Sequence, residues 1–390
     1  MMKPNETALQ NLLKRLTAIL TPPPRVNVRE WADANRVLSR EGSSKSGRYR
    51  SDARPYQVEP QEEITNPEVQ SHVWMFASQT GKTEMCNNIV GFFMDVDPAP
   101  MLVVQPTIER AEEWSKERLA PMIRDCPSLR GKVKSPRSRD SGNTVLTKSF
   151  PGGNIAIAGA NAPSGLAARP RRVVILDEID RFPLSAGTEG DPCALAERRT
   201  EDFFNAVVVK TSTPTVRGSS RIEPEFNETD KRHWFCPCPK CGEFQWLKWS
   251  QVKWPEGEPE AARYECEKCA AQLEDAQRVA MVRAGEWRAT APFKGRRGYF
   301  LNGINSLSKH KTGFKGRLHQ MVADFLSAKA GGKHKLRTWV NTFLAETFQD
   351  ETEKVEPFSL MGRREGYTAA PSSVLVITAG ADVQQDRVEI

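Results

Sequence analysis

The chain has 390 residues and a net charge of +7, because 56 lysines and arginines exceed 49 aspartates and glutamates. This mild basicity permits a polyanionic partner without demonstrating one. Mean hydropathy is −0.55, and no apolar run approaches the roughly 18 residues of a transmembrane helix, so we expect no membrane span. The amino terminus lacks the apolar stretch of a signal peptide. Eight cysteines, four of them in C-x-x-C pairs, favour a reducing compartment and a metal site over disulfides.

The first predicted elements are helices. Leucines at helical spacing predict a helix over 5–20, and Thr21-Pro22-Pro23-Pro24 ends it. This helix either packs on its own chain or docks on a partner. A second, shorter helix is expected around residues 28–38, before a glycine- and serine-rich loop at 41–47.

An α/β domain is predicted next, since short apolar strands alternate with helical or loop segments from about residue 51 to about residue 225. This alternation is typical of a mostly parallel sheet. The candidate strands are 71–77, 101–105, 154–158, 172–177 and 205–211.

The composition changes after residue 225. Residues 231–290 hold five of the nine tryptophans and both C-x-x-C pairs, which indicates a small inserted metal module. Helical spacing returns at 315–350, and the apolar run at 374–383 predicts a buried strand that starts a further domain. The predicted domains are a helical arm (1–50), the α/β core (51–230), the metal module (231–290), a helical linker subdomain (291–370) and the start of a further domain (371–390).

A phosphate-binding loop is predicted at Ser78-Gln79-Thr80-Gly81-Lys82-Thr83, between an apolar strand and a helix. In such loops the backbone amides and one lysine hold nucleotide phosphates, and the final hydroxyl ligates Mg²⁺. The strict pattern, G-x-x-x-x-G-K-[ST], has its first glycine six residues before the lysine. This chain has Phe76 at that position. A plain loop is the alternative.

An acidic strand end follows at Asp177 and Glu178, directly after four apolar residues. Such a pair supplies one carboxylate to Mg²⁺ and another to the attacking water. The alternative is a pair of carboxylates that cap a neighbouring helix. With Lys82 in the loop, the two acids predict ATP hydrolysis. For Asp180 a solvated or capping role and a functional role stay open.

Hydroxyl residues end two further strands, at Pro106-Thr107 and at Thr211-Ser212-Thr213. Beside a nucleotide they could sense the γ-phosphate and transmit the signal, whereas ordinary helix capping is the alternative. Tyr56 and Gln57 lie upstream of the loop at a distance that suits adenine contact. A packed tyrosine and an exposed glutamine are the alternative. Three arginines at 169–172 either meet phosphates or form a solvated turn.

The two C-x-x-C pairs predict a structural zinc site. Cys238 and Cys241 are separated by 24 residues from Cys266 and Cys269, and two such turns close a tetrahedral thiolate shell. A redox pair is the alternative. Cys236 could substitute for a ligand. The remaining cysteines, expected to be ordinary thiols, are Cys86, Cys126 and Cys193.

Asp382 ends the last apolar strand. A carboxylate at such a strand end suits a nuclease that activates water with metal ions. A strand-end aspartate is also common as a cap or turn residue.

The order of these motifs resembles the large terminase subunit of tailed bacteriophages, in its lambda-type gpA family. The segments that carry the resemblance, from about residue 28 to the last residue, are 31–33, 54–56, 78–84, 105–107, 159–161, 176–181, 211–215, 238–242 and 380–384.

The resemblance implies a P-loop ATPase of the ASCE type, with a catalytic glutamate beside the Walker B aspartate. It also implies an inserted zinc-binding module and the first strand of a truncated RNase H-like nuclease domain. Lys82 and Thr83 would bind phosphates and Mg²⁺, Asp177 would complete the Mg²⁺ shell, and Glu178 would orient water. The segment Thr211-Ser212-Thr213 would couple hydrolysis to DNA movement.

The implied protein is a motor that packages phage DNA with ATP, Mg²⁺ and structural Zn²⁺. Its expected partners are double-stranded DNA, the small terminase subunit (through the amino-terminal helix), the procapsid portal and other copies in a ring. It would act in the host cytoplasm and transiently at the portal, and would be absent from the mature virion. Asp382 would be a first nuclease ligand, but one acid cannot hold two ions, so we expect ATPase activity without DNA cleavage. The alternatives are a helicase, for which 226–390 shows no second RecA-like domain, and a non-enzymatic zinc-dependent DNA-binding scaffold.

Overall fold

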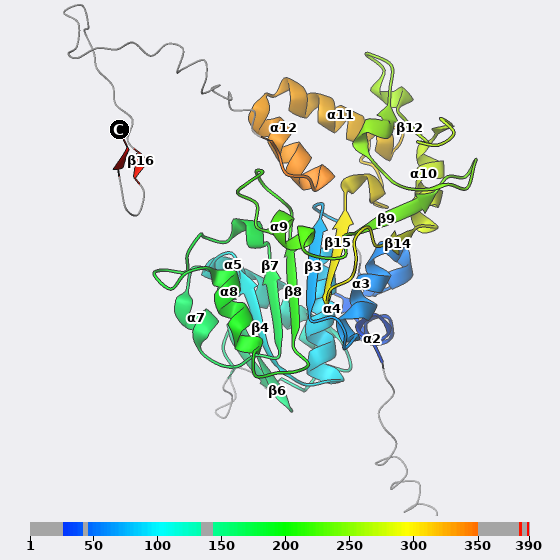
Figure 1. Ribbon diagram of the computed structural model, residues 1–390. Coiled ribbons are helices and arrows are strands. Elements are labelled where there is room, and N and C mark those ends of the chain that lie inside the picture. Colours follow the sequence, from blue (N-terminus) through cyan, green and yellow to red (C-terminus); the bar gives the residue numbers. More distant parts are fainter. Residues whose placement is uncertain (1–25, 42–45, 134–142, 350–381, 384–387, 390) are drawn as a thin grey trace, which may run out of the picture. The chain divides into compact units, whose positions relative to one another are not determined.

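The computed structural model describes residues 26–41, 46–133, 143–349, 382–383 and 388–389 (Figure 1). The chain separates into two compact units, 1–348 and 349–390. In the second unit, β16 (Asp382–Val383) pairs antiparallel with β17 (Val388–Glu389). The predicted helix at 5–20 and residues 374–381 of the predicted last strand lie outside the described residues. Within the described ranges, no helix is long and apolar enough to cross a membrane.

A ten-stranded sheet forms the centre of the first unit, in the order β10-β9-β15-β3-β8-β7-β4-β6-β5 with β14 also on β9. The run from β9 through β6 is parallel, and β5, β10 and β14 each join it antiparallel. The prediction of a mostly parallel sheet is therefore confirmed. Its strands are β3 (Ser71–Phe76), β4 (Pro100–Gln105), β5 (Thr147–Phe150), β6 (Gly153–Gly159), β7 (Val173–Asp177), β8 (Val207–Ser212), β9 (Arg232–Pro237), β10 (Phe244–Trp246), β14 (Glu286–Arg288) and β15 (Arg296–Leu301).

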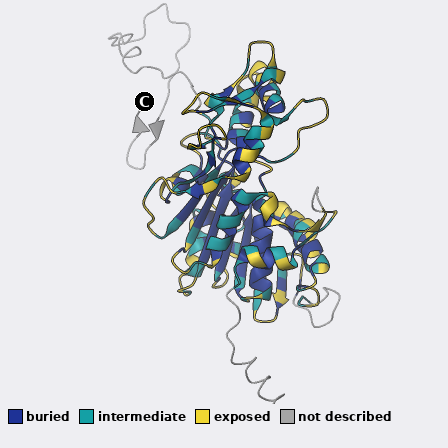
Figure 2. Cartoon of the chain, turned by 90° about the vertical axis from the view of Figure 1, so that its right-hand side faces the viewer, coloured by how far each residue is buried: buried dark blue, intermediate teal, exposed yellow. Residues whose placement is uncertain are grey.

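Helices cover both faces of this sheet, so its central strands are buried on both sides and mostly apolar, with His72 in β3 and Lys210 in β8 as buried exceptions. All five residues of β7 are buried, and alternate side chains enter different cores: Ile175 joins one cluster and Leu176 joins the other. Figure 2 shows these strands as buried between the helices. The helices are α2 (Val28–Asn35), α3 (Val58–Glu62), α4 (Lys82–Asp95), α5 (Ile108–Trp114), α6 (Ala120–Asp125), α7 (Pro163–Ala167), α8 (Pro192–Glu197), α9 (Ile222–Asn227), α10 (Asp275–Arg283), α11 (Arg317–Ala330) and α12 (Lys333–Trp339).

The five candidate strands correspond to β3, β4, β6, β7 and β8, with ends within two residues of those predicted. The helix expected at 315–350 is α11, α12 and a π-helical turn at Val340–Leu344. Gly331 and Gly332 separate the two α-helices. The shorter helix expected at 28–38 is α2, which ends at Asn35.

The strand β15 is a central element that the sequence did not reveal. It lies between β9 and β3 and pairs with β3 over its whole length. The strand begins with Arg296 and Arg297, so it lacks the apolar run by which the other strands were predicted. The guanidinium of Arg297 is neutralised by Asp230 at 2.9 Å and Glu63 at 2.7 Å, so a charged residue is accommodated inside the sheet. Through β15, the strands β9, β10 and β14 of the expected metal module continue the main sheet.

Five short strands complete the cysteine-rich region and the amino-terminal segment. A separate three-stranded sheet consists of β11 (Val252–Lys253), β12 (Arg263–Glu265) and β13 (Gln272–Leu273). Before the main sheet, β1 (Val37–Leu38) pairs with β2 (Gly47–Arg48), and α2 packs on α4 through Trp31, which lies over Gly91.

Candidate functional site

The loop between β3 and α4 has the tight turn that a phosphate-binding loop requires. Gln79 and Gly81 have φ of +62° and +99°, and the Thr80 hydroxyl donates to the carbonyl of Ala77 at 2.7 Å. At the position where the strict pattern asks for glycine, Phe76 is fully buried and its ring stacks on Trp74 and Trp287. The phenylalanine side chain therefore points into the core and leaves the loop unobstructed.

Lys82 begins α4 and is 6% exposed. Its Nζ donates to the Phe76 carbonyl at 2.9 Å and lies 3.7 Å from Oε1 of Glu178. Burial lowers the pKa of Lys82, and the carboxylates of Glu178 and Asp177 oppose that effect. Residues 96 positions apart thus meet at one point of the sheet edge, as the sequence predicted.

Asp177 ends β7 as a buried carboxyl group. Its Oδ2 accepts from Gln105 Nε2 at 3.1 Å, whereas Oδ1 is buried and has no partner within the described ranges. Burial, followed by the negative charge of Glu178, raises the pKa of Asp177 to about 6. An oxygen without a partner, on the last residue of a strand beside the loop, is suited to a cation ligand.

Glu178 follows in the left-handed region, with φ of +60°. This conformation is unfavourable for a residue with a Cβ and is typical of functional turns. Its carboxylate is reached by Lys82, by the Thr213 hydroxyl at 3.4 Å and by Arg181 at 3.7 Å. The side chain is 25% exposed, so a water molecule can approach it.

The strand β8 lies between β3 and β7, so its end, Thr211 to Thr213, lies between the loop and the acids (Figure 1). Ser212 Oγ accepts from the Asp180 amide at 3.2 Å, and Thr211 Oγ1 is buried without a partner in the described part of the chain. Asp180 in turn accepts from the amides of Arg221 and Ile222 at the start of α9. The capping alternative for Asp180 is therefore the one that the structure shows.

Thr83 lines a cavity of about 190 Å³ with Asp177, Gln105, Arg110 and other residues of the segment after β4. The last predicted hydroxyl of the loop and the buried acid thus share one space. Thr107, the other strand-end hydroxyl, accepts from the Arg110 amide at 3.3 Å and is the ordinary cap of α5.

Tyr56 and Gln57 are both buried, in contrast to the exposed glutamine of the alternative interpretation. The Tyr56 ring is 1% exposed and lies edge-on to Trp234, so it presents no free face to a base in this conformation. Gln57 Nε2 donates to the Thr80 carbonyl at 2.5 Å, and Gln57 Oε1 accepts from Tyr49 at 3.2 Å. Through these hydrogen bonds Gln57 stabilises the conformation of the loop, a role that the sequence did not indicate.

The arginines before β7 lie at the opposite end of that strand from Asp177. Arg171 binds the Asn154 side chain, Arg172 pairs with Asp97, and Arg169 is exposed. Arg171 and Arg172 are structural in this chain and do not reach the acidic pair of the same molecule.

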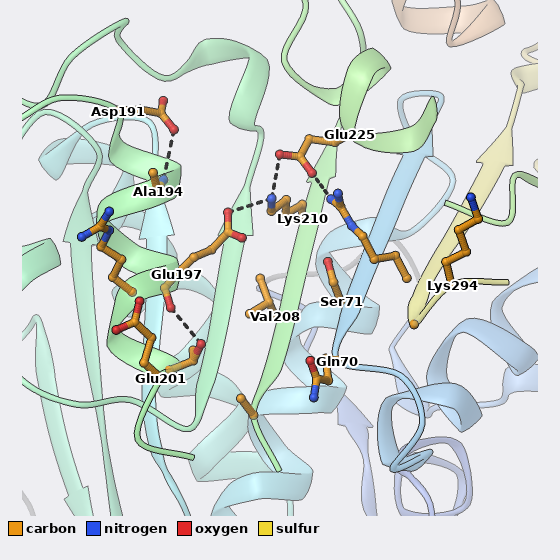
Figure 3. A pocket seen from close by; sticks show the side chains of 15 residues that line it. Gln70, Ser71, Asp191, Ala194, Glu197, Glu201, Val208, Lys210, Glu225 and Lys294 are labelled. Atoms are coloured by element: carbon orange, nitrogen blue, oxygen red, sulfur yellow. Dashed lines mark hydrogen bonds and ion pairs between the residues drawn. The ribbon is translucent and has the colours of Figure 1, made fainter. Parts of the chain in front are cut away.

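A different cavity, of about 650 Å³, lies near the start of β3 and β8 (Figure 3). Lys210 enters it between Glu197 and Glu225, each 2.7 Å from Nζ. Acidic and basic side chains neutralise one another there, and none of the predicted site residues lines it.

The four predicted cysteines come together. Cys238 and Cys241 follow β9, Cys266 and Cys269 follow β12, and their Sγ atoms lie within 4.8 Å of one another. The distances Cys238–Cys269 and Cys241–Cys266 are 3.9 and 3.8 Å. Thiolates about 2.3 Å from a tetrahedral zinc ion are about 3.8 Å apart, so the arrangement fits that ion.

Backbone and side-chain donors surround these thiols. Gln245 Nε2 donates to Cys266 Sγ at 3.1 Å, and the Lys240 amide donates to Cys238 Sγ at 3.4 Å. Although burial alone would raise it, hydrogen bonds from the Cys269 backbone amide, the Gln245 side chain and the Lys268 backbone amide lower the pKa of Cys266 to about 6. Cys236 is outside the cluster: it is fully buried in β9 beside Asn305.

Two family models match the chain. The model for the ATPase domain of the phage terminase large subunit gpA matches residues 43–287. The chain belongs to the gpA family of phage terminase large subunits. The model for the gpA endonuclease domain matches residues 296–390. This second match begins at the first residue of β15, before the start at 371 that the sequence suggested for the last domain. Asp382, the predicted nuclease ligand, lies in β16.

Two gpA relatives align over nearly the whole chain. The large terminase subunits of Enterobacteria phage P21 and Escherichia phage lambda are 29% and 28% identical over 395 residues. Each alignment covers 96% of this chain and 61% of the relative, so the chain spans about three fifths of their length. Solved structures similar to it include the HK97 large terminase (13% identity, 82% and 55% coverage, TM-score 0.48) and the Thermus phage P74-26 ATPase domain (13%, 75% and 93%, 0.42).

Proposed function

We propose that this chain is the ATP-hydrolysing motor part of a phage DNA-packaging terminase. The observation that carries the proposal is the convergence of Lys82 and Glu178, whose charged atoms are 3.7 Å apart at the end of β3 and β7. The carboxyl ends of parallel strands are where such sheets bind ligands. Membership of the gpA family supports the substrate assignment.

In this proposal, the loop amides from Ser78 to Thr83 and the Lys82 ammonium hold the β- and γ-phosphates. The Thr83 hydroxyl and the unpartnered Asp177 Oδ1 would hold Mg²⁺, which when bound neutralises charge on the phosphates. Glu178 accepts a hydrogen bond from a water molecule and turns its oxygen toward the γ-phosphorus. The water oxygen bonds to that phosphorus while one water proton passes to the Glu178 carboxylate and later to solvent. The bond to the β–γ bridging oxygen breaks, ADP leaves as the anion, and inorganic phosphate is the second product.

The residues Thr211, Ser212 and Thr213 would report the state of this site. Thr213 contacts Glu178, and Ser212 contacts Asp180, which holds the amino end of α9. A change at Glu178 therefore has a hydrogen-bonded route to α9. This is the physical basis on which we assign the coupling role to the end of β8.

The cysteine cluster would hold a structural zinc ion. The four Sγ atoms fill all positions of a tetrahedral shell, so no position remains for water or substrate. The ion would fix the turns after β9 and β12 and thereby the outer part of the sheet.

The remaining proposals rest on family membership. They are double-stranded phage DNA as the cargo, the small terminase subunit and procapsid portal as partners, a ring of copies as the active form, and the host cytoplasm as the location. We further propose that Tyr56 and Gln57 contact the nucleotide and that Asp382 binds a nuclease metal. Tyr56 would reach a base only if its ring left the packed position against Trp234.

The test is steady-state ATP hydrolysis by the chain and two variants. Lys82→Ala and Glu178→Gln should each lower kcat by at least about 100-fold, because each removes a group that acts on the phosphates or water. The matched controls are Lys116→Ala and Glu286→Gln, two ion-paired side chains that are more than half exposed and lie outside the Thr83–Asp177 cavity, and both should leave kcat unchanged. Wild-type turnover in both site variants would refute the catalytic assignment.

A further inference from the structure

A second cationic side chain, that of Arg54, lies at the phosphate loop. A methyl group added to Gly81 would come within 2.9 Å of Arg54 Nη1, on the side of the loop where Gln57 also lies. Arg54 therefore contacts the glycine that directly precedes Lys82. The phosphate-loop pattern does not include it, because it is 27 positions before Gly81 in the sequence.

The backbone that carries Arg54 is held in place. Its amide donates to the Ser51 carbonyl at 3.0 Å, and its carbonyl accepts from the Gln57 amide at 2.9 Å. Ser51 is fixed by Asp33 through its amide at 2.7 Å and its hydroxyl at 2.5 Å. Gln57, three residues on, binds the loop itself through Thr80. One short segment thus touches the loop at two consecutive residues.

The Arg54 guanidinium has no hydrogen bond and no ion pair with the residues that the structure describes. The carboxylates near this arginine are those of Asp33 and Glu84, which, like Arg54, shift the pKa of the neighbouring Tyr49 hydroxyl by their charge. Both are engaged by other groups: Asp33 by Ser51, and Glu84 by Arg36 at 2.9 Å. The half-buried arginine thus keeps its donors available beside a loop built to bind an anion.

We propose that Arg54 is a ligand of the nucleotide phosphates. A guanidinium presents several N–H donors in one plane and suits bidentate binding of phosphate oxygens. Arg54 would approach the phosphates from the Gly81 side, while Lys82 approaches from the side of Glu178. This inference rests on the proposed function, because it requires that the loop hold a nucleotide.

The experiment measures dissociation constants for fluorescent (MANT) ADP and ATP in wild type, Arg54→Ala, Arg54→Lys and Arg50→Ala. Arg54→Ala should weaken both nucleotides by about tenfold, and Arg54→Lys should lie in between. Arg50 is four residues away, highly exposed and paired with Asp52, so Arg50→Ala is the matched control and should bind as wild type.

Competition separates a phosphate contact from damage to the loop. Inorganic tripolyphosphate should displace MANT-ADP less well from Arg54→Ala than from wild type, whereas adenosine should displace it equally well from both proteins. Unchanged nucleotide affinity, or equal losses for adenosine and tripolyphosphate, would overturn the inference. Should Arg54→Ala lose its fold, Arg54→Met keeps the aliphatic stem and carries the same expectation.

These outcomes are distinct from failure of the proposed function. If wild type hydrolyses ATP and Arg54→Ala binds nucleotide normally, only the Arg54 assignment fails. If wild type binds no nucleotide while correctly folded, the proposed function and the Arg54 assignment both fail.

Discussion

The support of the phosphate loop by Gln57 can be tested by replacing Gly81 with alanine. A Cβ at this position would lie 2.1 Å from Gln57 Nε2, so the glutamine must withdraw from the loop. Withdrawal breaks its bond to the Thr80 carbonyl and the bond from Tyr49, each worth about 1 kcal/mol. The backbone at φ of +99° adds about 1–2 kcal/mol. We therefore expect Gly81→Ala to lower the free energy of unfolding by about 3–4 kcal/mol.

Gly190 is the matched control. Its φ of +101° is nearly that of Gly81, and nothing lies within 4 Å of the Cβ that alanine would add. Gly190→Ala should therefore cost only the backbone contribution, about 1–2 kcal/mol. In a Gln57→Ala background, Gly81→Ala should fall to nearly the same value, because the remaining overlap, with Arg54 Nη1 at 2.9 Å, involves the far end of a flexible side chain. The coupling free energy between Gly81 and Gln57 is then about 2 kcal/mol.

The assay is urea unfolding followed by tryptophan fluorescence, with all variants at one pH and salt concentration. Equal losses for Gly81→Ala and Gly190→Ala would refute the reasoning. So would an effect of Gly81→Ala that is unchanged when Gln57 is absent, because the overlap with Gln57 would then carry no energy.

Three further predictions concern buried charge and metal. Burial lowers the pKa of His72 from 6.5 to about 3, so the unfolded chain takes up this proton at higher pH, and His72 should lower the free energy of unfolding by about 2 kcal/mol from pH 7 to pH 5. Burial also lowers the pKa of His233 to about 4, so His72→Leu should reduce the pH-dependent loss in urea titrations by about 2 kcal/mol without abolishing it. An identical pH profile in wild type and variant would contradict this. Lys210→Met leaves Glu197 and Glu225 without their shared cation and should lower the free energy of unfolding, measured in urea, by about 2 kcal/mol. Adding Glu197→Gln should recover part of this loss, and an unchanged free energy of unfolding in the single variant would contradict the prediction. Purified protein should contain about one equivalent of zinc, bound by the four cysteines. Removal of the metal by a chelator, or Cys269→Ser, should lower Tm by at least about 3 °C. Full zinc content in Cys269→Ser would refute ligation by four cysteines.

Much of the central sheet could be predicted because strands that are buried on both faces consist mainly of consecutive apolar residues, which form a recognisable run in the sequence. The strand β7 is the clearest case, since its last residues are also the acidic pair. The strand β15 could not be found in this way, because its arginines are neutralised by Asp230 and Glu63 from distant segments. Charge compensation between such segments leaves no local pattern in the sequence.

The candidate site divides in the same manner. The predictions of Lys82, Asp177, Glu178 and the four cysteines rest on residue type and spacing, because phosphate and zinc binding require particular side chains at particular separations. The supporting residues do not. Gln105 holds Asp177, and Gln57 holds Thr80, through single hydrogen bonds that any nearby amide could make. Only their positions in space identify them.

The place of β15 bears on how this polypeptide can be divided. The gap between the two family matches, residues 288–295, invites a cut that would separate an ATPase fragment from the rest. A fragment ending there would lack the partner of β3 along six residue pairs and would expose an unpaired strand edge beside the loop between β3 and α4. Exposed edges of this kind recruit foreign strands and aggregate. Any fragment intended for isolated study should therefore retain the chain through Leu301.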